Sequence, residues 1–383
     1  MEIKYTDVVE LFNILENQHP NLYFNISKEK FWEQVNALEH FWAKFDVYKQ
    51  NFYLKHLFAL IGDLHTMCFF TFSEGKDFPF EVKRLAGKYY ISNLDADFID
   101  KKYLFAEILG LNNLAISEVE KLICQILPAE IKEGKFGRIC THLTYLNVLK
   151  TIGVVSEDQL TLMVKQNDEQ ENIKIQAVRC DKNKYIFKPS LPYLFENQDL
   201  HYYFKIKDFA LSQTDLPHGY DARFNNFVLS ALNKFGKKPV VVDLRDNAGG
   251  YASMFNIVFD EFEKQGLPLY CLLNNNSLSA SVMLATRIKN CGGLLVGENA
   301  GQPYKFFAYG GGVQATKSGI RFKCSKKLVS CKVNGKRQNK NKPFMVDVEI
   351  METIEDIKKG IDKPLEFCVK NIKKLNAELA FNK

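Results

Sequence analysis

The sequence lacks any apolar run long enough to cross a membrane, any close cluster of cysteine and histidine, and any repeat or low-complexity tract. A membrane-spanning helix needs about 20 consecutive apolar residues, so no membrane span is expected. Closely spaced Cys and His ligands mark structural zinc sites, so no metal site is expected either. The first twenty residues carry acids inside their apolar stretch, unlike a secretory signal. We therefore expect a cytoplasmic protein, or the mature form of an exported one.

Nine cysteines, an odd number without close pairs, indicate free thiols in a reducing compartment rather than a disulfide framework. The net charge of +6 comes from lysines spread along the chain, which does not by itself indicate a nucleic-acid partner. Only the run 326–342 concentrates positive charge, and such a run is more typical of a solvated loop or hairpin than of a phosphate-binding patch. No nucleic-acid partner is expected.

Three stretches with different periodicity divide the 383 residues. Residues 1–78 carry apolar side chains at helical spacing, which predicts an N-terminal helical region. Residues 79–180 combine short strands with a helix, a pattern that fits either a peptide-docking module or a structural linker domain. In residues 181–383 apolar strands alternate with amphipathic helices. This alternation predicts an α/β core of buried parallel strands with helices outside.

Local signals place several helix ends. Asp7 with Glu10 predicts a capping box at the first helix, and Ser27 predicts the start of the second. A third helix is expected to end near Gly62. The segment FNNFVLSALNKF, residues 224–235, predicts an amphipathic helix ahead of the core strands.

The first unusual loop, residues 243–250, reads DLRDNAGG and directly follows the apolar run Val240 to Val242. The loops at the carboxyl ends of parallel strands are where reactive groups collect. Two adjacent glycines let a backbone approach a ligand closely and point its amides at an incoming anion. The same residues would equally well form a tight turn without any function.

The second unusual loop, residues 274–281, reads NNNSLSAS and leads directly into a predicted helix. A hydroxyl at such an elbow lies near the positive end of the helix dipole, and small neighbours leave room for a substrate carbonyl. Ser279 is therefore placed to act as a nucleophile. Taken by themselves, Ser277, Ser279 and Ser281 are more often simple helix caps.

Together the two loops resemble a known family. DLRDNAGG, followed by SLSASVMLA and then GGLLVGENAG, is similar to the motifs of the C-terminal-processing (tail-specific) and tricorn-core serine peptidases. IGDLHT, residues 61–66, resembles the D-x-H-T element of a bacterial, histidine-base branch of that family, and residues 89–126 resemble its PDZ-like module. The resemblance covers most of the chain. It implies a crotonase-like or Clp-like α/β spiral with a PDZ-like α+β module.

The resemblance also implies a set of functional residues. It assigns Ser279 as the nucleophile, and the amides of Ala280 and of Gly249 or Gly250 as the oxyanion hole. The implied substrate is a peptide or an unfolded protein tail, cleaved through an acyl-enzyme. No metal or organic cofactor is implied, because acyl transfer by a serine needs none.

The base is less well marked in the sequence. Processing proteases use a lysine after their V-G-E element, but in GENAGQPYKFFAYGGG the nearest one, Lys305, is displaced from the matching position. The tricorn-like branch takes its base from an upstream histidine, which His65 matches. An imidazole is the better base near neutral pH without a large pKa shift, so His65 is favoured over Lys305. His201 and His218 are weaker rivals.

The third member of a triad stays open between Asp63, Glu298 and Asp347, with Glu298 as first choice. Two features depart from the family pattern: Val282 stands where processing proteases carry an acid, and KVNGKRQNKNK is basic where the family has an acidic residue. These departures favour an alternative function. In that alternative the chain is a catalytically inactive relative that binds peptides or a small ligand.

Overall fold

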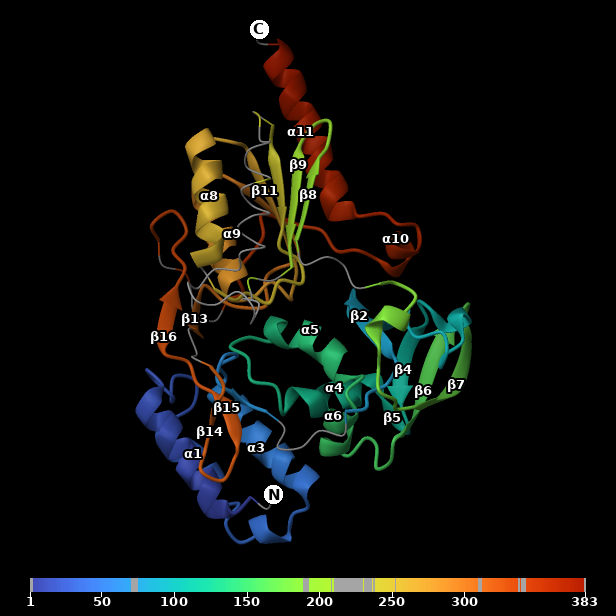
Figure 1. Ribbon diagram of the computed structural model, residues 1–383, viewed down its shortest axis with the longest axis vertical. Helices are drawn as coiled ribbons and strands as arrows, with labels where there is room; N and C mark the ends of the chain where they lie inside the picture. Colours follow the sequence, from blue (N-terminus) through green and yellow to red (C-terminus); the bar gives the residue numbers. More distant parts are fainter. Residues whose placement is uncertain are drawn as a thin grey trace. The chain divides into compact units, whose positions relative to one another are not determined.

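The computed structural model divides into two compact units, shown in Figure 1. Unit 1 comprises Met1–Pro189 and Phe306–Val329, and unit 2 comprises Ser190–Lys305 and Ser330–Lys383. The structure describes residues 3–69, 75–188, 193–207, 209, 230, 236, 238–251, 253–308, 312–336, 338 and 342–381. The helix predicted at 224–235 lies outside these residues, apart from Ser230.

The first layer of unit 1 is mainly helical. Its elements are α1 (Tyr5–Gln18), α2 (Lys28–Asn36), the 3-10 helix η1 (Trp42–Lys44), α3 (Val47–Ile61) and a small antiparallel sheet of β1 (Met67–Cys68), β15 (Arg321–Lys323) and β14 (Gln314–Ala315). Ile320, Phe322 and Cys324 complete the apolar core between the helices. This packing draws the segment Phe306–Val329 into unit 1, although the sequence analysis places it in the α/β core.

The helix ends follow local capping chemistry. Ser27 caps α2, because its hydroxyl accepts a hydrogen bond from the amide of Lys30 at 3.3 Å. Gly62 ends α3 in the left-handed conformation, with a φ of 70°, as predicted. The capping box predicted at Asp7 is wrong in its position. Asp7 lies inside α1 and accepts from the amide of Lys4, which is the residue that precedes the helix.

The second layer of unit 1 is a twisted antiparallel sheet with helices packed against it. The strand order is β2-β3-β4-β6-β7, with β5 beside β4. The strands are β2 (Phe80–Leu85), β3 (Lys88–Leu94), β4 (Glu107–Leu111), β5 (Leu114–Ala115), β6 (Gln159–Gln166) and β7 (Glu169–Gln176). The helices are α4 (Ile116–Cys124), α5 (Glu133–His142) and α6 (Leu146–Thr151), with 3-10 turns η2 (Lys101–Tyr103) and η3 (Lys182–Lys184). The stretch thus contains three α-helices rather than one.

Unit 2 is built on a six-stranded sheet in the order β17-β12-β11-β10-β9-β8. Its strands are β8 (Tyr193–Asn197), β9 (Tyr202–Ile206), β10 (Val240–Asp243), β11 (Leu269–Leu273), β12 (Leu294–Gly297) and β17 (Val348–Glu349). All neighbours are parallel except β8 and β9. Buried parallel strands were predicted for this stretch, and the mixed α/β class is confirmed.

Helices cover both faces of the unit 2 sheet. Figure 1 shows α8 (Ser253–Gln265) and α9 (Ala280–Asn290) on one side and α11 (Lys363–Phe381) on the other. On the α11 side, Cys368 and Ile372 pack on Val241, Leu272 and Val296 of the strands. The central strands β10 and β11 are therefore fully buried, which explains why they are nearly continuous apolar runs.

Three shorter elements complete the part of the chain that the structure describes: α10 (Ile354–Lys358), β13 (Lys305–Ala308) and β16 (Lys327–Ser330), of which the last two pair with each other. The basic run 326–342 thus contains a strand and a tight turn that joins Val333 to Lys336, in line with the predicted loop or hairpin. Among the described residues, no helix combines the length and apolar character needed to cross a membrane.

A buried ion network ties the end of β10 to the region before α11. The Asp243 side chain is fully buried, and Arg245 Nη2 lies 2.7 Å from Asp243 Oδ2 and 2.6 Å from Asp362 Oδ2. The Tyr203 hydroxyl donates to the same Asp243 oxygen at 2.5 Å. Burial opposes the ionisation of Asp243, but the Arg245 charge holds its pKa below the ordinary value. Arg245 therefore anchors the beginning of the DLRDNAGG loop.

Arg245→Met is expected to destabilise the protein by about 3 to 5 kcal/mol, because it leaves the buried Asp243 carboxylate without its main partner. Lys358→Met is the control, since Lys358 and Glu355 form an exposed pair whose loss costs about 1 kcal/mol or less. Urea denaturation of both variants measures the difference. Equal free energies of unfolding would contradict the anchoring role of Arg245.

Candidate active site

The two unusual loops of the sequence follow the carboxyl ends of two neighbouring strands in the middle of the sheet. Asp243, the last residue of β10, lies opposite Leu272 of β11 in a parallel register. The loop after β10 and the loop after β11 therefore start side by side. Both predicted segments belong to the same site.

Asn247 joins the two loops from a fully buried position. Its carbonyl oxygen accepts from the amide of Leu278 at 2.9 Å and from the hydroxyl of Ser281 at 2.6 Å. Its side-chain amide donates to the carbonyl of Ile206 on β9 at 2.9 Å. One asparagine thus holds the nucleophile loop, the glycine loop and a strand in one arrangement.

A second set of hydrogen bonds joins the same two loops through Asp246. Asp246 Oδ1 accepts from the side-chain amides of Asn274 and Asn276, each at 2.9 Å. The amide of Asp246 donates in return to Asn274 Oδ1 at 3.0 Å. Asp246 of the first loop is therefore hydrogen-bonded to Asn274 and Asn276 of the second.

Ser279 lies at the point where the second loop turns into α9, in a strained backbone conformation. Its φ is 55° and its ψ is −115°. A non-glycine residue in such a region costs about 1 to 3 kcal/mol, and persists only where its surroundings enforce it. Here the enforcing contacts are the hydrogen bonds of the adjacent Leu278 and of Ser281. The Ser279 side chain is partly exposed and makes no capping hydrogen bond to α9.

The neighbouring serines have structural roles. The Ser277 hydroxyl donates to the carbonyl of Leu244 at 2.8 Å, and the Ser281 hydroxyl is fully buried against Asn247. Val282, which stands where processing proteases carry an acid, is buried in the core. These residues shape the elbow that presents Ser279.

Gly249 lies against Ser279, with a φ of 91°. A Cβ atom on Gly249 would lie 2.6 Å from the Cβ of Ser279 and 2.8 Å from the carbonyl oxygen of Leu278, so no side chain fits there. The amide of Gly249 donates to Asn247 Oδ1 at 2.8 Å. Gly249 therefore contributes close packing, and its N–H is used within its own loop.

The other two predicted amide donors differ from Gly249. Ala280 is the first residue of α9, where helix amides have no acceptor within the helix. Gly250 is exposed, with a φ of 134°. Among the described residues, no acceptor is found for the amide of Ala280 or for that of Gly250.

The amide of Ser279 donates to Oε1 of Gln302, which is completely buried. Gln302 thus helps to hold the elbow from the segment between β12 and β13. Gln302 could not be identified from the sequence, because nothing in GENAGQPYKFF distinguishes a supporting glutamine from an ordinary loop residue.

The remaining candidates of unit 2 occupy separate positions. Glu298 accepts from the side-chain amide of Asn275 at 2.5 Å, so it braces the nucleophile loop. Asp347 pairs with Lys289 and accepts from the amide of Leu295 at 2.9 Å, which fastens β12. Lys305 is the first residue of β13 and is half-buried.

His65 lies in unit 1, in the turn that joins α3 to β1. Its amide donates to Asp63 Oδ1 at 2.9 Å, and its ring stacks on that of Phe306 with centroids 6.2 Å apart. Burial lowers the pKa of His65, and although the charge of Asp63 opposes this, the pKa stays below its ordinary value. The imidazole is therefore neutral at neutral pH, as a general base must be.

Asp63 is a buried carboxylate held by several donors. Its Oδ2 accepts from Thr66 Oγ1 at 2.5 Å and lies 3.0 Å from Nε2 of His19. Burial opposes its ionisation, but the hydrogen bond from His19 and the nearby His65 hold the pKa of Asp63 below its ordinary value. His19 was missed by the sequence analysis, because its spacing from Asp63 carries no recognisable motif. Of the weaker histidine rivals, His201 is buried beside β9 and His218 lies outside the described residues.

No family model and no curated protein matches the chain. Several solved structures do match the chain. Mature CPAF complexed with lactacystin aligns with a TM-score of 0.69 at 11% identity, over 99% of each chain. Mature CPAF aligns with a TM-score of 0.66 at 11% identity, over 99% of this chain and 98% of its own. A serine-to-alanine mutant of CPAF aligns with a TM-score of 0.68 at 10% identity, with the same coverage.

These alignments define the class of fold first: along its whole length the chain is similar in fold to a solved peptidase structure. The particular fold that it resembles is that of CPAF.

Gly249→Ala is expected to lower the reactivity of Ser279 toward a fluorophosphonate by about a hundredfold or more. The added methyl group displaces the elbow, and displacement of a reacting group by about 1 Å costs that much. Gly266→Ala is the matched control, since Gly266 also has a positive φ but nothing within 4 Å of the added atom. Equal labelling rates in the two variants would show that the contact with Ser279 is unimportant.

Proposed function

We propose that the chain is a serine peptidase that cleaves peptides or unfolded protein tails through an acyl-enzyme on Ser279. The observation that carries this proposal is the strained, partly exposed Ser279 at the start of α9, packed against Gly249 on two interlocked loops. Strain of this kind concentrates at functional sites. The peptidase fold along the whole chain supports the same conclusion.

The proposed reaction follows from ordinary acyl transfer. Ser279 Oγ attacks the peptide carbonyl carbon while the base takes the hydroxyl proton. The negative charge that develops on the carbonyl oxygen is stabilised by the amides of Ala280 and Gly250. Gly250 is proposed in preference to Gly249, because the Gly249 amide is hydrogen-bonded to Asn247. The base then protonates the leaving amine, and a water molecule hydrolyses the ester by the reverse sequence. No metal or cofactor takes part in these steps.

For the base we propose His65 in preference to Lys305. A neutral imidazole accepts a proton directly, whereas a lysine must first lose its own. Asp63 is the proposed orienting carboxylate, because its Oδ1 binds the amide of His65 and its charge favours the imidazolium that forms. Glu298, the first choice from sequence, is proposed instead as a brace for the Asn275 side of the loop.

We also propose four further assignments that follow from the sequence alone. They are the crotonase-like or Clp-like spiral, membership of the tail-specific and tricorn-like family, the division at residues 78 and 180, and a cytoplasmic location. Residues 79–180 are proposed to act as a PDZ-like module that binds an extended peptide by strand addition. The sheet of this region ends in β2 and β7, which offer such edges.

Ser279→Ala is expected to abolish fluorophosphonate labelling and to lower peptide hydrolysis by at least about a thousandfold. Ser330→Ala, at an exposed serine of the same unit, should retain both. The two variants are compared by labelling and by cleavage of a fluorogenic peptide library. Wild-type protein that is folded yet neither labelled nor active would favour the alternative, an inactive relative that binds peptides or a small ligand.

His65→Gln is expected to lower kcat/KM by about 10² to 10⁴-fold, the usual contribution of a general base. Lys305→Met should change it by less than about tenfold. Circular dichroism confirms that both variants are folded before their rates are compared. A larger loss in the lysine variant would transfer the base to Lys305.

A further inference from the structure

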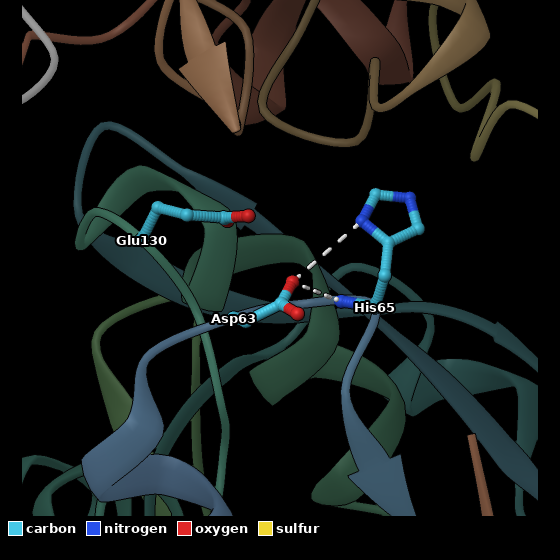
Figure 2. Close-up of side chains that lie close together, drawn as sticks. All are labelled: Asp63, His65 and Glu130. Carbon is cyan, nitrogen blue, oxygen red and sulfur yellow. Dashed lines mark hydrogen bonds and ion pairs between the residues drawn. The ribbon is translucent and has the colours of Figure 1, made fainter. Parts of the chain in front are cut away.

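Three side chains from two distant parts of the sequence lie close together in unit 1. Asp63, His65 and Glu130 each offer one oxygen or nitrogen atom, and these atoms all lie within 4.8 Å of one another. Figure 2 shows Asp63 and His65 from the turn after α3, with Glu130 reaching the same space from the segment before α5. Glu130 carries no motif and was not a candidate in the sequence analysis.

The spacing of the first two side chains suits a bridging ion better than a direct hydrogen bond. His65 Nδ1 and Asp63 Oδ1 are 4.0 Å apart, whereas hydrogen bonds span about 2.7 to 3.2 Å. Zinc binds imidazole nitrogen and carboxylate oxygen at about 2.0 to 2.2 Å. One ion between the two atoms therefore reaches both after a small rotation of the ring.

The atoms that would bind the ion are largely buried, although His65 and Glu130 are half-buried as residues, and the Asp63 carboxylate is already oriented. Asp63 is 1% exposed, and His65 Nδ1 and Glu130 Oε2 are buried atoms. The contacts from His19 and Thr66 hold Asp63 Oδ2, whereas Oδ1 accepts from the His65 amide and lies 4.0 Å from Nδ1 of the ring. Hydrogen-bonded carboxylates of this kind are usual around protein metal ions.

The charges around the cluster define what it binds. Asp63 and Glu130 are two carboxylates that lie close together, where they repel each other and attract a cation. Arg138 interacts with Glu130 and, together with Lys323, lies close enough to influence His65. These two cations weaken binding of any metal, so the site suits a reversible ion rather than a permanent structural one. One imidazole and two carboxylates favour zinc over magnesium, which prefers oxygen ligands alone.

We propose that Asp63, His65 and Glu130 bind a zinc ion that switches off the peptidase. A neutral imidazole has one lone pair and one N–H. When zinc takes the lone pair on Nδ1, the ring proton is on Nε2, and the ring has no lone pair left to accept the serine proton. This inhibitory consequence rests on the proposed function, in which His65 is the base.

Zinc binding is tested on the untagged full chain by calorimetric titration, and by the visible absorption of Co²⁺ as a spectroscopic substitute. Wild-type protein is expected to bind one equivalent at this site. Glu130→Gln should weaken the binding at least about tenfold, since a ligand is lost. The control is Glu157→Gln, at an exposed carboxylate of the same unit, which should bind as the wild type does. Thermal unfolding checks that both variants are folded.

Inhibition is measured as the ratio of the peptide cleavage rate in zinc to that in EDTA. In the wild type this ratio should be about one tenth or less, and the cleavage rate should recover when EDTA is added to the zinc-treated protein. Magnesium in place of zinc should leave the rate nearly unchanged. In Glu130→Gln, zinc should lower the rate much less than in the wild type. Equal zinc affinity in wild type and Glu130→Gln overturns the site. Zinc binding without a lower rate overturns its inhibitory role. If no cleavage occurs in EDTA, the proposed function fails, while the titration still decides on the zinc site.

Discussion

The arrangement of the site depends on the hydrogen bonds that Asn247 makes between two loops. Its backbone carbonyl and its side-chain oxygen bind Ser281, and the carbonyl also binds the amide of Leu278. Ser279 lies between these two residues, so its unfavourable backbone conformation is imposed from both sides. A single buried asparagine can do this because buried polar groups must be satisfied, and an alternative loop arrangement would leave several of them without partners.

The same junction explains why small residues surround Ser279. Gly249 approaches the Ser279 Cβ so closely that any side chain would separate the loops. The buried Gln302 holds the amide of Ser279, and Glu298 holds Asn275. Close packing and polar contacts therefore act together to present one hydroxyl. The chemistry proposed for Ser279 depends on this rigidity, because an oxyanion hole works through donors that are oriented before the reaction.

Unit 1 contributes a different kind of polar centre. Asp63 is held by contacts from two parts of unit 1: His19 after α1, and the turn before β1, which supplies the Thr66 hydroxyl and the amide of His65. An oriented carboxylate next to a neutral imidazole serves a general base, and the same pair serves a metal ion when a second carboxylate is near. Glu130 adds that second carboxylate. In this view the proton and the zinc ion compete for one lone pair of His65.

Much of the α/β core could be predicted from the sequence. Apolar runs such as Val240 to Val242 indicate strands buried on both faces, and the loops DLRDNAGG and NNNSLSAS stand out because glycine, asparagine and serine replace the apolar pattern. Parallel strands put such loops at one edge, so their proximity also follows from the pattern. The sequence thereby determined the elbow residue Ser279 and its glycine neighbour as candidates.

Only the tertiary structure decided how these residues are held. That Gly249 uses its amide within its own loop, that Gln302 and His19 support the site, and that Glu130 meets His65 all depend on contacts between segments far apart in the chain. The return of residues 306–329 to unit 1 has the same origin, because Ile320, Phe322 and Cys324 fill a core made by the N-terminal helices. Local periodicity reports the face that a residue buries, but not the distant surface against which it is buried.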